Sequence, residues 1–417
     1  MGKHDVVMTE AEQADVIERA RELAKEFAAV GPQADADNRF PKELVPLYKE
    51  ANLPALAVPK EYGGLGADIW TTTLVSKELA KGDPGAALAF NMHQTMIGIF
   101  RGLLDDAAKE RVFSQVVNER KIVCGPFSED RAGLSGLADT VAIPDGRGGW
   151  RINGKKTWAT LCQGADIVAF NATVTDADGE LPEDFLEHAS RESVFILPMD
   201  TPGISIKETW DTMGMRATGT HTVIFDDVAA PADSYGGNFR QGLFGEFEWA
   251  SMSFAGVYQG LAEKAYTECR EILKKKTLGA TMEGKDVALK GVGFVQYGLG
   301  KLLLETQAAA RTLEATGKIL IEGRDAEWDP IARTAWLDVA KVTSTENAIR
   351  ATDAALRLVG GQAFRRGHVL ERLYRDARAG PFHPLTTDQA YDLLGRSELG
   401  LLAAPEPAPT DEQVVAA

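Results

Sequence analysis

The chain has 417 residues, of which 44% are hydrophobic and 25% are charged, and its formal net charge at pH 7 is −16. A chain of this length can build roughly two or three domains with well-buried cores, and the composition is typical of a soluble globular protein. The negative charge weighs against a nucleic-acid-binding function, because contacts to phosphates need a basic surface.

The sequence lacks the usual signals for membranes, secretion and metal binding. No apolar run approaches the roughly 20 residues that cross a bilayer. The start, MGKHDVVMTEAEQADVIERA, has no apolar signal core and no Ser or Thr at position 6 for myristoylation. Cys124, Cys162 and Cys269 are too far apart for a metal motif or an evident disulfide framework. We therefore expect a cytoplasmic protein without a metal site.

The first part of the chain is predicted to be helical. Apolar residues recur at helical spacing over 9–30. A turn-rich loop, PKEYGGLGA, occupies 59–67. Further helices are expected at 41–52, 67–81, 85–103 and 106–118. These stretches predict an N-terminal helical domain over residues 1–119.

The pattern changes at Ile122, where short runs of Val, Ile and Phe begin to alternate with Gly, Asp and Pro. Such alternation predicts β-strands separated by turns, and hence a β-domain over residues 120–235. The segment 177–193 is expected to be an exposed loop. The strand-like stretches are KIVCGPF, GWRINGKKTWA, DIVAFNATV, SVFILPM and HTVIFDDVAAP.

Long helical patterns return after about residue 239 and predict a C-terminal helical domain over residues 236–403. Helices are expected at 242–275, 285–322, 330–359, 367–377 and 386–402. The tail over residues 404–417 is acidic and rich in proline, which predicts disorder. The predicted order along the chain is therefore α, then β, then α.

Nucleotide-binding and hydrolase motifs do not occur in the sequence. YGGLGAD and VGGQAF both break the G-x-G-x-x-G pattern, and neither follows a predicted strand. GMRATG, at 214–219, is not followed by the Lys-Ser/Thr pair of a phosphate-binding loop. We therefore do not expect a dinucleotide-binding domain or a serine hydrolase.

Five stretches, taken together and in order, resemble the acyl-CoA dehydrogenase superfamily of flavoproteins. They are PKEYGGLGA, CGPFSEDRAG, INGKKTWAT, MGMRATGTHTVIFDDVAAP and LVGGQAF with LERLYRDAR. The resemblance covers roughly residues 15–402. It implies an α+β fold with an N-terminal helical domain, a middle β-barrel-like domain and a C-terminal four-helix bundle.

The same resemblance implies a flavin between the β-domain and the bundle. The expected cofactor is FAD, with FMN as the alternative for a monooxygenase. The family forms homo-oligomers, dimers or tetramers such as a homotetramer, in which a neighbouring subunit helps to hold the cofactor. An electron-transfer flavoprotein or a flavin reductase is the expected redox partner.

Four residues match family positions at the flavin ring. Trp158 and Thr160 lie in KTWAT, where an indole can pack on the ring and a hydroxyl can hydrogen-bond near the flavin N5. Phe127 and Ser128 match the segment at the polar edge of the ring. Without the resemblance, Trp158 and Thr160 would be ordinary strand residues.

Five further residues match positions that contact the flavin or its pyrophosphate. Lys275 replaces a family arginine, which keeps the charge but loses the bidentate geometry. Arg357 replaces a glutamine and offers another cation. It precedes Gly360 and Gly361, which allow close backbone approach. Thr386 matches a threonine that contacts the flavin in the family.

The family's catalytic glutamate is missing from both of its usual positions, which hold Pro384 and Ala250 in this chain. His383 is next to the first position, and an imidazole can act as a general base near pH 7. Glu246 is one helical turn from the second position. His383 and Glu246 are the predicted catalytic residues. A turn histidine and a solvated carboxylate remain the structural alternatives.

Three functions remain open. The first, which is the predicted function, is α,β-dehydrogenation of an acyl thioester with hydride transfer to the flavin N5; the retained Trp-x-Thr strand favours it and the missing glutamate counts against it. The alternative is a reduced-flavin-dependent monooxygenase, which needs no α-proton base. The altered pyrophosphate contacts favour the alternative, as does Leu134, which replaces a serine near the thioester ligand of the family. A non-catalytic flavin scaffold is the third.

Overall fold

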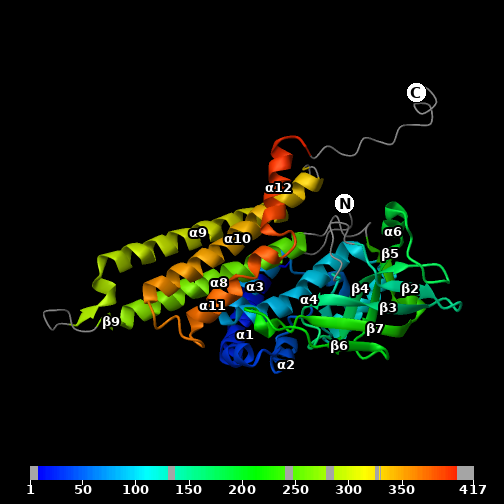
Figure 1. The fold of residues 1–417 in the computed structure, drawn as a ribbon, viewed down its shortest axis with the longest axis horizontal. Helices are drawn as coiled ribbons and strands as arrows, with labels where there is room; N and C mark the ends of the chain where they lie inside the picture. The colour runs from blue at the N-terminus through cyan, green and yellow to red at the C-terminus, as the bar shows by residue number, and fades with distance from the viewer. Residues whose placement is uncertain are drawn as a thin grey trace.

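A computed structural model of the chain describes residues 8–129, 137–239, 248–278, 286–324, 328 and 330–401. Within these residues, helices from the two ends of the chain lie together on one side of a β-sheet region, as Figure 1 shows. The predicted order of helices, strands and helices is confirmed. None of the described helices combines the length and the apolar character needed to cross a membrane.

Among the N-terminal α-helices, α1, α3, α4 and α5 begin at a capping side chain, and α2 does not. Thr9 forms a capping box with Glu12 at the start of α1. The Asp83 side chain accepts the Ala86 N–H at the start of α4, where Pro84 occupies the first helical position. The helices are α1 (Glu10–Asp37), α2 (Leu44–Glu50), α3 (Ile69–Gly82), α4 (Pro84–Leu103) and α5 (Asp106–Asn118), with a short 3-10 helix, η1 (Lys60–Tyr62).

The middle of the chain forms a sheet in which the described strands follow the order β6-β7-β3-β2-β4-β5-β8, with β1 paired to β4. The long strands β3 and β7 are antiparallel, and their register shifts between Lys156 and Ala159. This irregularity surrounds Trp158. The strands are β1 (Val123–Cys124), β2 (Val141–Pro144), β3 (Trp150–Ala159), β4 (Ile167–Val174), β5 (Glu192–Pro198), β6 (Ile204–Lys207), β7 (His221–Ala230) and β8 (Tyr235–Asn238).

The prediction of a loop over 177–193 was wrong in part, because this segment contains α6 (Phe185–Arg191). The Asp184 side chain accepts the Glu187 N–H and so caps the helix. His188 faces inward and is buried, with its Nε2 2.9 Å from the Thr173 hydroxyl oxygen. This single inward side chain gives a short, mostly exposed helix one anchor on the sheet.

The C-terminal helices α8, α9 and α10 lie side by side along the length of the molecule (Figure 1). A short hairpin of β9 and β10, which was not predicted, joins the first two of these helices. The elements are α8 (Glu248–Lys275), β9 (Thr277–Leu278), β10 (Val287–Ala288), α9 (Gly293–Ile321), α10 (Pro330–Val359), α11 (Val369–Ala377), η5 (Gly380–Phe382) and α12 (Thr387–Glu398). The predicted disordered tail lies outside the described residues.

The two helical regions share one core, because α3 packs on both α1 and α8. Glycines on α8 make the close approach possible. A Cβ on Gly260 would lie 2.3 Å from the Lys77 carbonyl oxygen, and a Cβ on Gly256 would lie 2.6 Å from that of Thr73. Larger residues at these positions would push the helices apart. The helices on both sides of the sheet domain in sequence therefore form one rigid support for it.

Candidate active site

Trp158 displays its indole at the surface near the end of β3. Its side chain is 62% exposed, and its backbone has a positive φ of 56°, which is rare for a residue with a large side chain. The Thr160 N–H donates to the Trp158 carbonyl oxygen at 2.8 Å, so the chain turns directly after the tryptophan. The edge of Trp210 packs against the indole, with ring centroids 5.5 Å apart. The exposed indole is thus held in a defined place.

Thr160 is half-buried beside this indole and is connected to two buried threonines. Its Oγ1 lies 2.9 Å from that of Thr220, which lies 2.7 Å from that of Thr218. The Thr218 hydroxyl donates to the Met215 carbonyl oxygen at 2.9 Å. These hydroxyls form a continuous chain from the β6–β7 loop to the surface at Thr160.

Phe127 and Ser128 lie next to the same end of β3. The Ser128 carbonyl oxygen accepts the Thr157 N–H at 2.9 Å, one residue before Trp158. The Phe127 ring packs against Phe239, with centroids 4.9 Å apart. The structure therefore brings together the four residues that were predicted to contact the flavin ring. Leu134 lies outside the described residues.

His383 is half-buried against two aromatic side chains of α8. Its Nε2 lies 2.8 Å from the Tyr258 hydroxyl oxygen, and its ring stacks on Phe254 with centroids 4.2 Å apart and an interplanar angle of 10°. Burial, aided by the nearby Lys341 ammonium, lowers the pKa of His383 to about 3. The imidazole is therefore neutral at pH 7, and Nε2 is engaged by Tyr258.

The two positions at which relatives carry the glutamate hold no acid or base. Ala250 is half-buried on α8, one helical turn before Phe254. Pro384 is exposed and directly follows His383. Glu246, the second predicted catalytic residue, lies outside the described residues.

Two charged residues of α10, missed by the sequence analysis, lie beneath this region. Lys341 is buried, and its Nζ donates to the carbonyl oxygens of His383, at 2.9 Å, and Leu385. Asp338 is also buried and accepts the Ser251 hydroxyl at 2.8 Å. Burial lowers the pKa of Lys341 and raises the pKa of Asp338. In the sequence, Asp338 and Lys341 are the two charged residues of the otherwise apolar stretch AWLDVAKV, and this pattern could have marked them as buried and functional.

Thr386 begins α12 as its N-cap. Its side chain accepts the Gln389 N–H at 3.3 Å, and the Gln389 side chain accepts the Thr386 N–H at 3.0 Å. This reciprocal pair is a capping box. The structure thus gives Thr386 a local role in starting a helix, and its predicted contact to the flavin stays a prediction.

The predicted pyrophosphate residues gather at another place. The C-terminal ends of α8 and α10 meet at the end of the bundle remote from the sheet (Figure 1), where the Lys276 Nζ donates to the Val359 carbonyl oxygen at 2.6 Å. Lys275 and Arg357 are exposed there. A Cβ on Gly360 or Gly361 would meet nothing within 4 Å. Within one chain, the end of the bundle that carries Lys275 and Arg357 is therefore far from the end of β3 that carries Trp158.

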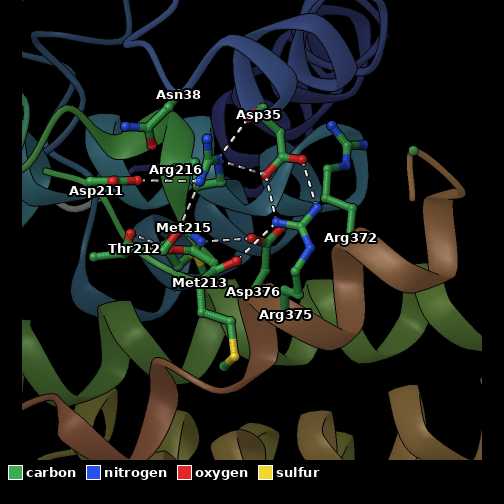
Figure 2. Close-up of polar contacts among 12 residues, drawn as sticks. Asp35, Asn38, Asp211, Thr212, Met213, Met215, Arg216, Arg372, Arg375 and Asp376 are labelled. Atoms are coloured by element: carbon green, nitrogen blue, oxygen red, sulfur yellow. Dashed lines mark hydrogen bonds and ion pairs between the residues drawn. The ribbon is translucent and has the colours of Figure 1, made fainter. Parts of the chain in front are cut away.

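A polar cluster ties the β6–β7 loop to both helical regions, as Figure 2 shows. Arg375 of α11 pairs with Asp35 of α1 at 2.6 Å, and Arg216 of the loop donates to the Asp35 carbonyl oxygen at 2.8 Å. The Asp376 carboxylate accepts the Met215 N–H at 2.6 Å. The cluster thus fixes Met215, the residue at which the threonine chain ends.

Asp376 is the most strongly perturbed carboxyl of this cluster. Burial, together with the negative charge of Asp83, raises its pKa to about 7. Arg372 opposes this shift and pairs with Asp83 at 2.7 Å. The Asp376 carboxyl group, which connects α11 to the β6–β7 loop, can therefore change its charge near neutral pH.

Comparisons with known proteins match the whole arrangement. The N-terminal domain of acyl-CoA dehydrogenases matches residues 10–120, the middle domain matches 127–228, and the C-terminal domain matches 252–387. The Bacillus subtilis (strain 168) protein YdbM, whose name places it provisionally among acyl-CoA dehydrogenases, is 29% identical over 390 residues, which cover 90% of this chain and 94% of that protein.

Two other matches are to proteins named for different chemistry. The L-evernosamine nitrososynthase of Micromonospora sp. (strain ATCC 39149 / NRRL 15099 / SCC 1413) is 29% identical over 397 residues, which cover 90% of this chain and 87% of that protein. FMN-bound TdsC from Paenibacillus sp. A11-2, a dibenzothiophene monooxygenase, superposes with a TM-score of 0.82 at 22% identity, covering 94% of this chain and 99% of TdsC. The predicted fold is confirmed. The chain belongs to the acyl-CoA dehydrogenase superfamily.

Proposed function

We propose that this protein is a reduced-flavin-dependent monooxygenase that uses FMN or FAD. The coarser assignment, a flavin oxidoreductase of the acyl-CoA dehydrogenase superfamily, is the same for a dehydrogenase and for a monooxygenase. In the proposed reaction, reduced flavin supplies two electrons and two protons. One oxygen atom of O₂ is transferred to the substrate, and the other leaves as water.

The residues near the end of β3 fit a flavin ring. The exposed indole of Trp158 offers a flat apolar surface for a planar heterocycle. The hydroxyl of Thr160 and the backbone of Ser128 flank this surface and supply polar contacts. The bound flavin would supply the redox chemistry, while these residues bind and orient it. FMN is the form seen in the TdsC structure.

The observation that carries the proposal is the state of His383. An acyl-CoA dehydrogenase needs a base for the α-proton, and Pro384 and Ala250 cannot provide one. His383 is the neighbouring candidate, but its pKa of about 3 makes it a poor proton acceptor at neutral pH, and its Nε2 is engaged by Tyr258. Oxygen transfer makes no demand for such a base. We propose that His383 and Tyr258 bind and orient the substrate.

The relatives narrow the class of substrate. A nitrososynthase named for an amino sugar and a monooxygenase named for a sulfur heterocycle both match most of the chain. Oxygen transfer to an amine nitrogen or a thioether-type sulfur is the chemistry common to these names. We therefore propose a small molecule with an oxidisable nitrogen or sulfur atom as the substrate.

Acyl-thioester dehydrogenation is the second candidate, favoured by the 29% identity to YdbM over 90% of this chain. In that case His383, or Glu246, would have to remove the α-proton. The oxidised flavoprotein would then lose its visible flavin absorbance when mixed with an acyl-CoA under anaerobic conditions.

The test compares the two reactions in one preparation. The protein is loaded with FMN or FAD and mixed anaerobically with a series of acyl-CoA thioesters. Separately, it receives reduced flavin and oxygen with amino sugars and sulfur heterocycles, and products are analysed for a mass gain of one oxygen atom. Oxygenated product without anaerobic flavin reduction supports the proposal. Flavin reduction by any acyl-CoA, without oxygenated product, contradicts it.

A further inference from the structure

The threonine chain that ends at Thr160 has a direction. Its inner end is the Met215 carbonyl oxygen, 2.9 Å from the Thr218 hydroxyl, and Thr220 connects Thr218 to Thr160 at 2.7 Å and 2.9 Å. Thr218 and Thr220 are buried, and Thr160 is half-buried beside the exposed indole of Trp158. The chain thus runs from a buried acceptor to the proposed flavin surface.

The number of hydroxyl hydrogens that find an acceptor decides in which direction the three threonines donate. Each hydroxyl has one hydrogen to donate, and a carbonyl oxygen can only accept. If every hydroxyl donates toward Met215, all three hydrogens have an acceptor. In the reverse direction no hydroxyl hydrogen lies between the Thr218 Oγ1 and the Met215 carbonyl oxygen, which then stand 2.9 Å apart as two acceptors. The carbonyl oxygen keeps the Trp210 Nε1–H at 2.9 Å and the Thr218 N–H at 3.2 Å, and the Thr160 hydrogen has no acceptor among the described residues. The inward direction contains one more hydrogen bond and is therefore the stable one.

With its hydrogen donated to Thr220, Thr160 offers only oxygen lone pairs to a bound molecule. We propose that this chain, the Thr218–Thr220–Thr160 relay, selects the reduced flavin over the oxidised flavin. The inference rests on the proposed function, in which the Thr160 hydroxyl contacts the flavin ring, and it takes that contact to be at N5, as the sequence resemblance implies. Reduced flavin carries a hydrogen on N5 and can donate it to Thr160, whereas the N5 of oxidised flavin is itself an acceptor. Two acceptors that face each other form no hydrogen bond, so the N5 of oxidised flavin stays unpaired against Thr160.

Such selection suits an enzyme that takes up flavin already reduced elsewhere and releases it after oxidation. Thr160 alone could turn its hydrogen to either redox state, because a hydroxyl rotates freely. Thr220 and Thr218 remove this freedom and are therefore positioning residues. They act through Thr160, and they would make no contact of their own with the flavin.

The test measures binding and needs no catalytic turnover. The dissociation constants of oxidised FMN and of chemically reduced FMN are determined anaerobically for the wild type and for Thr220→Val, which removes the central hydroxyl. The ratio of the two constants is expected to shift by roughly tenfold toward oxidised FMN, the size of one lost hydrogen-bond preference. Thr220→Ser, which keeps a hydroxyl, retains the wild-type ratio.

Thr222→Val is the matched control. Thr222 lies two residues further along, on β7, and its hydroxyl oxygen is 3.1 Å from that of Thr209, outside the relay. This variant is expected to keep the wild-type ratio. If Thr220→Val does not fold, Thr218→Val interrupts the relay one step earlier and is expected to give the same shift.

Two outcomes overturn the relay. One is an unchanged ratio in a folded Thr220→Val or Thr218→Val protein, and the other is an equal shift in Thr222→Val. A wild type that binds neither form of flavin contradicts the relay and the proposed function together. A wild type with the expected ratios but without oxygen transfer contradicts the monooxygenase proposal alone.

Discussion

The Nε2 of His383 and the hydroxyl oxygen of Tyr258 lie 2.8 Å apart, although the two residues are 125 positions apart in the sequence. The contact joins the segment after α11 to the middle of α8, and Phe254 completes the enclosure by stacking on the imidazole. These contacts hold the imidazole in place, and burial keeps it neutral at pH 7 by lowering its pKa. Removal of the imidazole therefore tests whether His383 acts as a base or holds the substrate.

His383→Ala is expected to leave the oxidation of bound reduced flavin by oxygen within about tenfold of the wild-type rate. A general base would instead contribute roughly 10²–10⁴-fold, and its loss would abolish flavin reduction by an acyl-CoA. Stopped-flow absorbance measures both rates. Tyr258→Phe, which removes the hydroxyl partner and keeps the ring, separates the loss of this hydrogen bond from the loss of the imidazole itself. A hundredfold or greater fall in anaerobic reduction by an acyl-CoA in His383→Ala would return His383 to the role of base.

The lowered pKa of His383 also predicts how stability depends on pH. Its folded pKa of about 3 lies below the ordinary value of 6.5, so protonation favours the unfolded chain. Its contribution to stability is therefore complete above about pH 6.5 and is lost as pH falls toward 3. His383→Gln is expected to show a weaker loss of stability between about pH 6.5 and 5. Denaturant titrations at both pH values test this, and parallel pH profiles for the two proteins would contradict it.

Trp158→Ala is expected to weaken flavin binding by roughly tenfold, because an aromatic stacking partner contributes about 1 kcal/mol beyond its buried area. Equilibrium titration with FMN and FAD measures the loss. The control is Trp150→Phe, at the other end of β3, where the indole packs on Phe195 and Tyr235 inside the sheet domain. Equal losses in the two variants would show that the effect is one of general stability.

Asp376→Asn is expected to stabilise the protein more at high pH than at low pH. The folded pKa of Asp376, about 7, lies above the ordinary 3.8, so its ionisation destabilises the fold as pH rises from about 4 to 7. An asparagine can still accept the Met215 N–H and does not ionise. The gain is expected to be about 1–3 kcal/mol at about pH 8.5 and smaller at about pH 5.

The control for Asp376→Asn is a second carboxylate of the same cluster that lies in an exposed environment. Asp83 and Asp35 raise its pKa, and Arg372 lowers it. Asp211→Asn changes an exposed carboxylate that pairs with Arg216 in the same cluster, and is expected to change stability little at either pH. Denaturant unfolding measures all three proteins. A gain for Asp376→Asn that is independent of pH would contradict the assignment.

The protein is expected to be a homo-oligomer in which Lys275, Arg357 and the Gly360-Gly361 turn contribute to the flavin site of a neighbouring subunit. Their position at the remote end of the bundle favours this arrangement, because one chain does not bring them to Trp158. Light scattering at micromolar concentration measures the oligomer. Arg357→Ala with Lys275→Ala is expected to weaken binding of FAD more than that of FMN. A monomer that holds flavin as tightly would contradict the proposal.

Local pattern predicted most of the helices and strands, and motif resemblance placed the four residues of the proposed flavin face close together. Trp158 and Thr160 could be proposed from sequence because they are close together and belong to one recognisable motif, KTWAT. The relay could not be found, because the contact between Thr160 and Thr220 joins residues 60 positions apart through the register of β3 and β7. The pKa of His383 likewise depends on enclosure by α8, which sequence neighbours do not reveal. Helix α6 was missed because its residues are mostly exposed and show little periodicity.

The central claim, oxygen transfer from a bound reduced flavin, is tested most directly by mixing the anaerobic protein–reduced flavin complex with oxygen and following two signals at once. One is the consumption of oxygen, and the other is the return of the visible absorbance of oxidised flavin. A monooxygenase is expected to consume oxygen first and to recover oxidised flavin after a clear lag, since it must keep the activated oxygen available for a substrate. Simultaneous changes with no lag, together with anaerobic reduction of the flavin by an acyl-CoA, would contradict the account and favour a dehydrogenase.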